Sequence, residues 1–157
     1  MSNHRALLKA LPAAILVCAS GFAAAADTQN LTVSATVSGV CKFSSAAQTL
    51  SFGTVDPSAA GPIPGSGAAV KYKCTKDTAA TGVTAGNGLN FSGGSRRMGN
   101  GTDFIAYTLT ISGGTQTGTG FGTGQDKDLT VGGSIVATDY QNASAGAYTD
   151  TVVLTLA

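Results

Sequence analysis

Three cysteines and one histidine are the residues of this sequence with the most versatile chemistry. They are Cys18, Cys41, Cys74 and His4, in a chain of 157 residues. Catalysis by a serine or cysteine nucleophile uses a neighbouring histidine as the base, and zinc sites are built mainly from histidine and cysteine. No histidine follows His4, and two or three cysteines are too few for an all-thiolate zinc site. The sequence therefore disfavours both kinds of site.

The other candidates for chemistry are acidic, glycine-rich and basic segments. Asp126 and Asp128 are a close acidic pair, but the residues around them lack the further oxygen ligands of a calcium loop, so a turn is preferred. Residues 118–124 are rich in glycine but lack the Gly-Lys-Ser/Thr ending of a phosphate-binding loop. Arg96 and Arg97 could contact an anion or a glycan, although a solvated pair is more common. We predict no catalytic activity, cofactor, metal or small-molecule substrate.

The N-terminus has the composition of a secretory signal peptide. Arg5 and Lys9 form a basic opening, an apolar run follows over residues 10–19, and small residues end at Ala26. The apolar run is shorter than the roughly 20 residues that span a membrane, so a retained anchor is the less favoured alternative. We predict a signal peptide over residues 1–26.

Export would leave two cysteines in a mature chain of 131 residues. Cys18 would be removed, and it follows the bulky Val17 rather than the small residue expected at a lipoprotein processing site. Paired cysteines form disulfides in oxidising compartments. We therefore predict a Cys41–Cys74 disulfide, with two free buried thiols as the alternative.

The mature chain has little net charge. It keeps seven basic residues and eight aspartates, with no glutamate and no tryptophan, so its net charge would be −1. A nucleic acid or an anionic membrane surface usually selects a basic patch. The sequence therefore predicts neither as a partner.

Short alternating segments, separated by glycine, asparagine, aspartate and proline, dominate the mature chain. No stretch of 12 residues keeps a helical period, so the pattern predicts an all-β sandwich or barrel. Strands are expected over residues 31–38, 40–45, 50–52, 70–75, 104–111, 129–136 (with a break at Gly132-Gly133) and 148–156, with one or two more in 76–103. Residues 57–67 and 113–124 are expected to be loops, the second of them flexible.

The first and the last of these segments are unusual in their position. The first precedes both mature cysteines and has one apolar face, formed by Leu31, Val33, Ala35 and Val37. The last ends at the C-terminus of the sequence and has an inward face formed by Tyr148, Val152, Leu154 and Leu156. About six strands can be counted from Val40 onward, whereas an immunoglobulin-like sandwich needs about seven. The count therefore predicts a spare strand at the start of the mature chain and a missing strand at its end.

A set of motifs occurs in a fixed order along the mature chain. They are Gly39-Val-Cys41, Leu50-Ser-Phe-Gly53 with Asp56-Pro57, Val70-Lys-Tyr-Lys-Cys-Thr75, Arg97-Met98, Ile105-Ala-Tyr107 and Gly146-Ala-Tyr-Thr-Asp-Thr151. In this order they resemble the spore coat protein U domain family, which includes the major subunits of archaic chaperone–usher pili. Phe121 stands where family members often have a tryptophan.

The resemblance implies an incomplete immunoglobulin-like β-sandwich that a donor strand from a neighbouring subunit completes. Residues 27–39 would be the donor segment, and residues 40–157 the incomplete pilin domain. The donor side chains would be Leu31, Val33, Ala35 and Val37. The acceptor groove would lie along the C-terminal strand, at Tyr148, Val152, Leu154 and Leu156.

The resemblance also implies a structural pilus (fimbrial) subunit that polymerises by donor-strand exchange and supports surface adhesion and biofilm formation. A homopolymer, a periplasmic chaperone and an outer-membrane usher are the expected partners, and the route runs through the periplasm to the cell surface. A non-polymerising secreted surface or spore-coat β-sandwich protein is the first alternative. A secreted carbohydrate-binding module or small hydrolase is the second, but no clustered aromatic or acidic site is visible for it.

Overall fold

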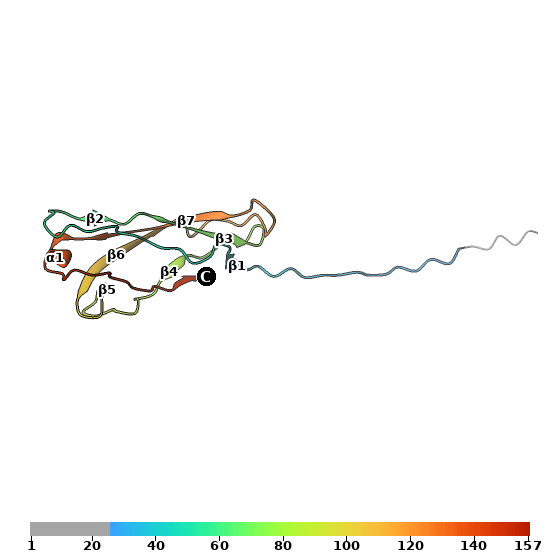
Figure 1. Cartoon of the computed structure of the whole chain (residues 1–157). Coiled ribbons are helices and arrows are strands. Elements are labelled where there is room, and N and C mark those ends of the chain that lie inside the picture. Colours follow the sequence, from blue (N-terminus) through green and yellow to red (C-terminus); the bar gives the residue numbers. More distant parts are fainter. Residues whose placement is uncertain (1–25) are drawn as a thin grey trace, which may run out of the picture. The chain divides into compact units, whose positions relative to one another are not determined.

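Figure 1 shows a computed structural model of the chain, which describes residues 26–157. The predicted signal peptide therefore lies outside the described residues, apart from Ala26. Strands are the main regular elements of the described chain, beside a helix of four residues, which confirms the predicted all-β class. Its elements are β1 (Cys41–Phe43), β2 (Ile63–Pro64), β3 (Ala68–Cys74), β4 (Val83–Ala85), β5 (Arg96–Gly99), β6 (Phe104–Ser112), β7 (Lys127–Ile135), α1 (Ala137–Tyr140) and β8 (Leu154–Leu156).

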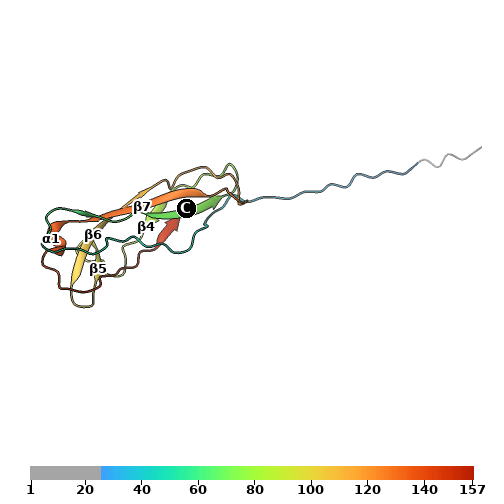
Figure 2. The ribbon, with the colours of Figure 1, turned by 45° about the horizontal axis from the view of Figure 1, so that its top comes forward.

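The strands form two antiparallel sheets. The larger has the order β1-β3-β7-β6-β5, with β2 pairing against β7 beyond the end of β3. The smaller consists of β4 and β8, which lie side by side near the C-terminus (Figure 2). Because β7 pairs with β3 and β2 on one edge and with β6 on the other, it is the centre of the larger sheet.

Alternation along β3 explains how the larger sheet buries one face. Val70, Tyr72 and Cys74 are buried, as the sequence pattern predicts, whereas Lys71 on the opposite face is exposed. The ammonium group of Lys71 lies 2.6 Å from the carboxylate of Asp128 on β7, across the solvent-facing side of the sheet. A period of two therefore separates an apolar inner face from a charged outer face.

The two sheets pack face to face around the inner side chains of β3 and β7. Leu129 and Val131 are buried there, and Val83 of β4 and Leu154 and Leu156 of β8 pack against them. A second cluster, nearer to α1, is built on Ile105, Tyr107, Ile135 and Tyr140. Two antiparallel sheets facing each other over a shared apolar core make an immunoglobulin-like sandwich, as predicted.

Residues 31–38, expected to be a strand, form none, and the expected loop of residues 57–67 contains β2. The structure differs from the expected strands at three further places. The Gly132-Gly133 break is absent, because β7 continues through both glycines; a Cβ at Gly133 would lie 2.5 Å from the carbonyl oxygen of Thr108, so glycine lets β6 approach closely. The expected strand over 50–52 is reduced to one bridge, between Ser51 and Ser66. Regular pairing of the last segment begins only at Leu154.

The glycine-rich loop of residues 113–124, expected to be flexible, is held by hydrogen bonds. The amide of Gly118 donates to the carbonyl of Thr78 at 2.8 Å, and that of Gly120 donates to the carbonyl of Cys74 at 3.0 Å. The ammonium group of Lys73 donates to the carbonyl of Gly122 at 2.9 Å. The loop therefore packs against the end of β3. No helix within residues 26–157 is long and apolar enough to span a membrane.

Candidate functional site: an open groove and an exposed apolar segment

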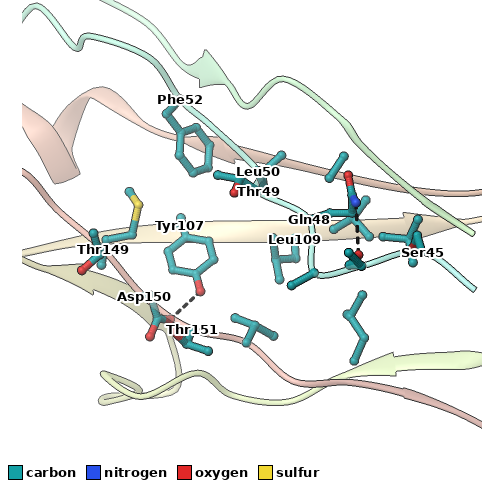
Figure 3. A pocket seen from close by; sticks show the side chains of 18 of the residues that line it. Ser45, Gln48, Thr49, Leu50, Phe52, Tyr107, Leu109, Thr149, Asp150 and Thr151 are labelled. Atoms are coloured by element: carbon teal, nitrogen blue, oxygen red, sulfur yellow. Dashed lines mark hydrogen bonds between the residues drawn. The ribbon is translucent and has the colours of Figure 1, made fainter. Parts of the chain in front are cut away.

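A groove of about 660 Å³ opens in the sandwich between residues 43–52 and residues 148–154. Figure 3 shows Tyr107 and Leu109 of β6 pointing into it, between Leu50 on one wall and Asp150 on the other. Further floor residues come from three more strands and are Ala68, Val70, Met98 and Val131. The groove therefore opens onto the apolar core between the two sheets.

A second hollow, of about 630 Å³, continues the groove toward α1. It shares Leu50, Phe52 and Tyr148 with the first hollow, and Ile135 and Tyr140 lie deeper in it. Together the two hollows follow the chain from residue 143 to residue 154. We call this combined channel the open groove.

The wall formed by residues 148–156 alternates strictly between half-buried and exposed side chains. The even-numbered residues are half-buried and the odd-numbered ones are exposed, including Val153 at 68%. Of the four side chains predicted to face inward, Tyr148, Val152 and Leu154 line the open groove. Leu156 lies beyond the groove, opposite Val83 of β4, and packs against the core.

The backbone of this wall is hydrogen-bonded along one edge only. Thr149 exchanges two backbone hydrogen bonds with Gly99 at the end of β5, and the carbonyl of Val153 accepts from the amide of Gly86. Within the described part of the chain, the amide and carbonyl groups of Tyr148, Asp150 and Val152 have no backbone partner. These even-numbered residues present their free groups to the open groove, as a sheet edge does.

The opposite wall is paired at both ends but not in its middle. The amides of Ser44 and Ser45 donate to the carbonyl of Lys71, which ties the start of this wall to β3. None of the backbone amides of residues 46–50 donates a hydrogen bond within the described chain. Both walls of the groove thus have main-chain groups for which an inserted strand would supply partners.

Asp150 places a carboxylate in the wall of the groove, between Thr149 and Thr151. Its Oδ2 accepts the Tyr107 hydroxyl at 2.5 Å, the bond drawn in Figure 3, and its Oδ1 accepts the amide of Leu89 at 2.8 Å. Burial raises the pKa of the Tyr107 hydroxyl, and the hydrogen bond to Asp150 raises it further. In the sequence, Asp150 stands out only as part of the motif over residues 146–151, although the alternation places it on the inward face.

The first alternating segment forms no strand within residues 26–40. Leu31, Val33 and Val37 are 85%, 83% and 81% exposed, and Ala35 between them is exposed as well. β-branched and apolar side chains at this level of exposure favour a partner that would cover them. The described residues offer no strand that pairs with this segment.

The predicted disulfide is present between Cys41 and Cys74. The two residues are directly opposite in the β1–β3 pairing, with their Cα atoms 4.1 Å apart, and Cys74 is fully buried. The disulfide fixes the residue at which the chain enters the larger sheet. It therefore anchors the C-terminal end of the exposed segment to the sandwich.

The other charged candidates have structural partners. The carboxylate of Asp126 accepts the hydroxyl of Ser44 at 2.5 Å, and this bond lowers its pKa. Arg96 donates to the carbonyl oxygens of Ala85 and Gly86, and the guanidinium of Arg97 lies 4.4 Å from the centre of the Phe104 ring. Within residues 26–157, no group of three histidine, cysteine or acidic side chains is arranged to hold a metal ion.

Comparisons with known proteins place the chain in a family. The sequence profile of the Spore Coat Protein U domain family matches residues 27–155. Protein U of Myxococcus xanthus is 38% identical over 168 aligned positions, which cover 92% of each chain. Among solved structures, the CsuC-CsuE chaperone–tip adhesion subunit pre-assembly complex from archaic chaperone-usher Csu pili of Acinetobacter baumannii matches with 26% identity and a TM-score of 0.48. That match covers 77% of this chain but only 40% of the other.

Proposed function

The chain belongs to the Spore Coat Protein U domain family, and from this premise we propose that it is a structural pilus subunit that polymerises by donor-strand exchange. In this proposal, residues 27–39 of one subunit (the donor segment) fill the open groove of the next. The observation that carries the proposal is the groove itself, which exposes core side chains between two walls with unpaired backbone.

The donor segment has the chemistry that the groove requires. Its alternation presents Leu31, Val33, Ala35 and Val37 on one face, while serine and threonine occupy the other. A strand between the two walls would place the apolar face on the floor around Tyr107 and Leu109, and its backbone would bond to both walls. Burying each of the three larger side chains would contribute about 1.5–3 kcal/mol, before the ordering of the segment is subtracted.

The positions of the chain ends support one direction for the proposed inserted strand. The chain enters the sandwich at β1, which contacts β8, whereas α1 lies at the opposite end of the sandwich (Figure 1). If subunits repeat in one orientation, the donor segment enters the groove from the α1 end and reaches toward Leu156. It then runs antiparallel to residues 148–156. A segment that folded back into its own groove would run parallel to them.

The core side chains in an open groove would also need to be covered before the subunits assemble. Exposed core side chains and free sheet edges promote aggregation. A periplasmic chaperone that lends its own strand would cover the groove, and an outer-membrane usher would exchange that strand for the donor segment. The resemblance seen in the sequence motifs implies both partners. Surface adhesion and biofilm formation would follow from a pilus on the cell surface.

A non-polymerising surface or spore-coat protein is the second candidate, and the family name favours it. In that case the donor segment would serve its own sandwich. The direction of the inserted strand distinguishes the two functions, because only exchange between subunits in one orientation gives an antiparallel strand.

The test compares two aspartate substitutions in the donor segment. Val33→Asp would place an unpaired charge in an apolar groove, which costs several kcal/mol, so filaments should be lost. Thr32→Asp is the matched control, because its side chain would face solvent and filaments should persist. Electron microscopy of the filaments and co-purification with the chaperone are measured together. Filaments of Val33→Asp at the normal level would refute the proposal. A Val33→Asp subunit that does not fold with its chaperone would favour the non-polymerising protein.

A further inference from the structure

We propose that Asp150 sets the register of the donor strand, because it accepts only the smallest of the four inward donor side chains, Ala35, opposite it. This inference rests on the proposed donor-strand exchange. It specifies which donor residue occupies each position of the groove, and it assigns to Asp150 a role in selecting that arrangement.

The carboxylate of Asp150 is the one charged group among the side chains that line the first hollow. Two of its lone pairs are used, by the hydroxyl of Tyr107 and the amide of Leu89. A carboxylate accepts about four hydrogen bonds, so the acceptor sites of Asp150 that remain need water or a polar partner. A large apolar side chain opposite it would remove that water without replacing its bonds.

The alternation limits the possible registers to steps of two residues. A shift of one residue would turn the apolar face of the donor segment to solvent. In an antiparallel pairing, the register with Ala35 opposite Asp150 places Leu31 opposite Leu154, Val33 opposite Val152 and Val37 opposite Tyr148. All three remaining pairs are then apolar on both sides, which stabilises cross-strand contacts.

The two neighbouring registers lack this match. A shift of two residues in one direction places Val33 opposite Asp150, and a shift in the other direction places Val37 there. Either shift puts a β-branched apolar side chain against the carboxylate. The register with Ala35 opposite Asp150 also lets residues 28–38 span the whole wall from Ala157 to Ala147.

Engineered disulfides between outward-facing residues can read the register without altering the groove. The backbone groups of the odd-numbered wall residues form hydrogen bonds toward β4 and β5. Toward the groove, these residues would therefore form non-hydrogen-bonded pairs with the donor strand, in which the two Cα atoms are about 4.5 Å apart. That separation suits a disulfide. In the proposed register Ser34 lies opposite Thr151; the two shifted registers place it opposite Thr149 or Val153.

Three double variants of the full-length protein are therefore compared in assembled filaments. We expect Ser34→Cys/Thr151→Cys to give a covalent ladder on a non-reducing denaturing gel. Ser34→Cys/Thr149→Cys and Ser34→Cys/Val153→Cys should give little. A ladder from either of the latter overturns the register but leaves the donor-strand function intact. A cross-link within one subunit, or none in any variant despite folded protein, overturns the donor assignment itself.

A size test addresses the role of Asp150. Ala35→Leu should reduce filament yield about tenfold or more, since overpacking opposite Asp150 is unfavourable. Val33→Leu, opposite Val152, is the matched control and should be better tolerated. If Ala35→Leu assembles as well as Val33→Leu with the Ser34–Thr151 cross-link intact, the role of Asp150 in selecting the register is refuted.

Discussion

The hydroxyl of Tyr107 lies 2.5 Å from a carboxylate oxygen of Asp150, so the floor of the open groove is hydrogen-bonded to its wall. The other carboxylate oxygen holds the amide of Leu89. Gly88, with a φ of +84°, lies so close to this carboxylate that a side chain there would clash with it. One acidic residue thus joins β6, the last segment of the chain and the loop after β4. These bonds hold the wall of the groove against its floor.

A chain that carries its own donor strand should fold without a partner. If the donor strand is antiparallel and residue 28 lies opposite Ala157, a copy of residues 28–38 could follow Ala157 through a hairpin loop of only two to five residues. Removing residues 1–39 from this variant leaves no second donor segment. We expect this self-complemented chain to be a stable monomer by light scattering and thermal unfolding.

The length of the connecting loop provides the control for strand direction. A parallel donor strand would begin at the far end of the groove, and its linker would have to span 11 residues of strand, roughly 36 Å. If a long linker stabilises the chain and a short hairpin loop does not, the strand runs parallel. The proposed filament, in which the subunits repeat in one orientation, would then be wrong.

Tyr107→Phe should make the self-complemented chain less stable at neutral pH and less sensitive to alkali. The variant loses a hydrogen bond to a charged acceptor, worth about 1.5 kcal/mol or more. Burial and this bond raise the pKa of Tyr107 in the folded state, whereas the unfolded tyrosine ionises near pH 10. The contribution of Tyr107 to stability is therefore present below about pH 10 and lost as the pH rises toward the raised pKa.

Urea unfolding between pH 7 and pH 11 measures both effects. The difference in unfolding free energy between the parent chain and Tyr107→Phe should shrink above about pH 10. A constant difference over this range would mean that Tyr107 does not titrate differently in the folded and unfolded states.

The alternation in the sequence predicted correctly which side chains share a face, but it did not predict which strands pair. It placed Val70, Tyr72 and Cys74 of β3 on one buried face, because a period of two assigns side chains to faces wherever a sheet has a dry side. The same period over residues 31–38 predicted a strand, yet the described chain has none there. A pattern indicates that a segment favours a sheet, but it does not identify the strand that pairs with it.

Where the predictions from sequence were wrong or incomplete, the role of the residue depends on contacts with distant parts of the chain. Gly132-Gly133 suggested a break, since glycine weakens strands, but close approach of the Thr108 carbonyl makes glycine the residue that fits at Gly133. Asp150 was not predicted as a groove residue, and its partners Tyr107 and Leu89 lie 43 and 61 residues away in sequence. Local patterns carry no information about such distant partners.

Removal of the disulfide should weaken the self-complemented chain without abolishing its fold. Cys41 and Cys74 close a loop with a sequence separation of 33, for which the chain-entropy estimate is about 3–4 kcal/mol. The double variant Cys41→Ala/Cys74→Ala should lose this amount in urea unfolding. Addition of a reductant should destabilise the parent chain but leave the double variant unchanged. Equal sensitivity of both to reductant would contradict the prediction.

Two glycines in the loop of residues 113–124 should respond in opposite ways to alanine. A Cβ at Gly118 would lie 2.5 Å from the carbonyl oxygens of Cys74 and Thr75, so the loop would have to move away from β3. The amide of Gly118 also bonds to the carbonyl of Thr78 at 2.8 Å, and this bond would be strained by that movement. We expect Gly118→Ala to cost about 1–3 kcal/mol.

Gly122 is the matched control within the same loop. Its Cβ would meet only the side chain of Gln125, at 3.8 Å, and its φ lies outside the left-handed region. Gly122→Ala should therefore be neutral or should stabilise the self-complemented chain by about 0.4–1 kcal/mol, through a less flexible unfolded state. Urea unfolding of both variants measures the contrast. Similar stabilities for Gly118→Ala and Gly122→Ala would mean that the loop is not packed against the end of β3. The loop would then be flexible, which is what the sequence alone predicts.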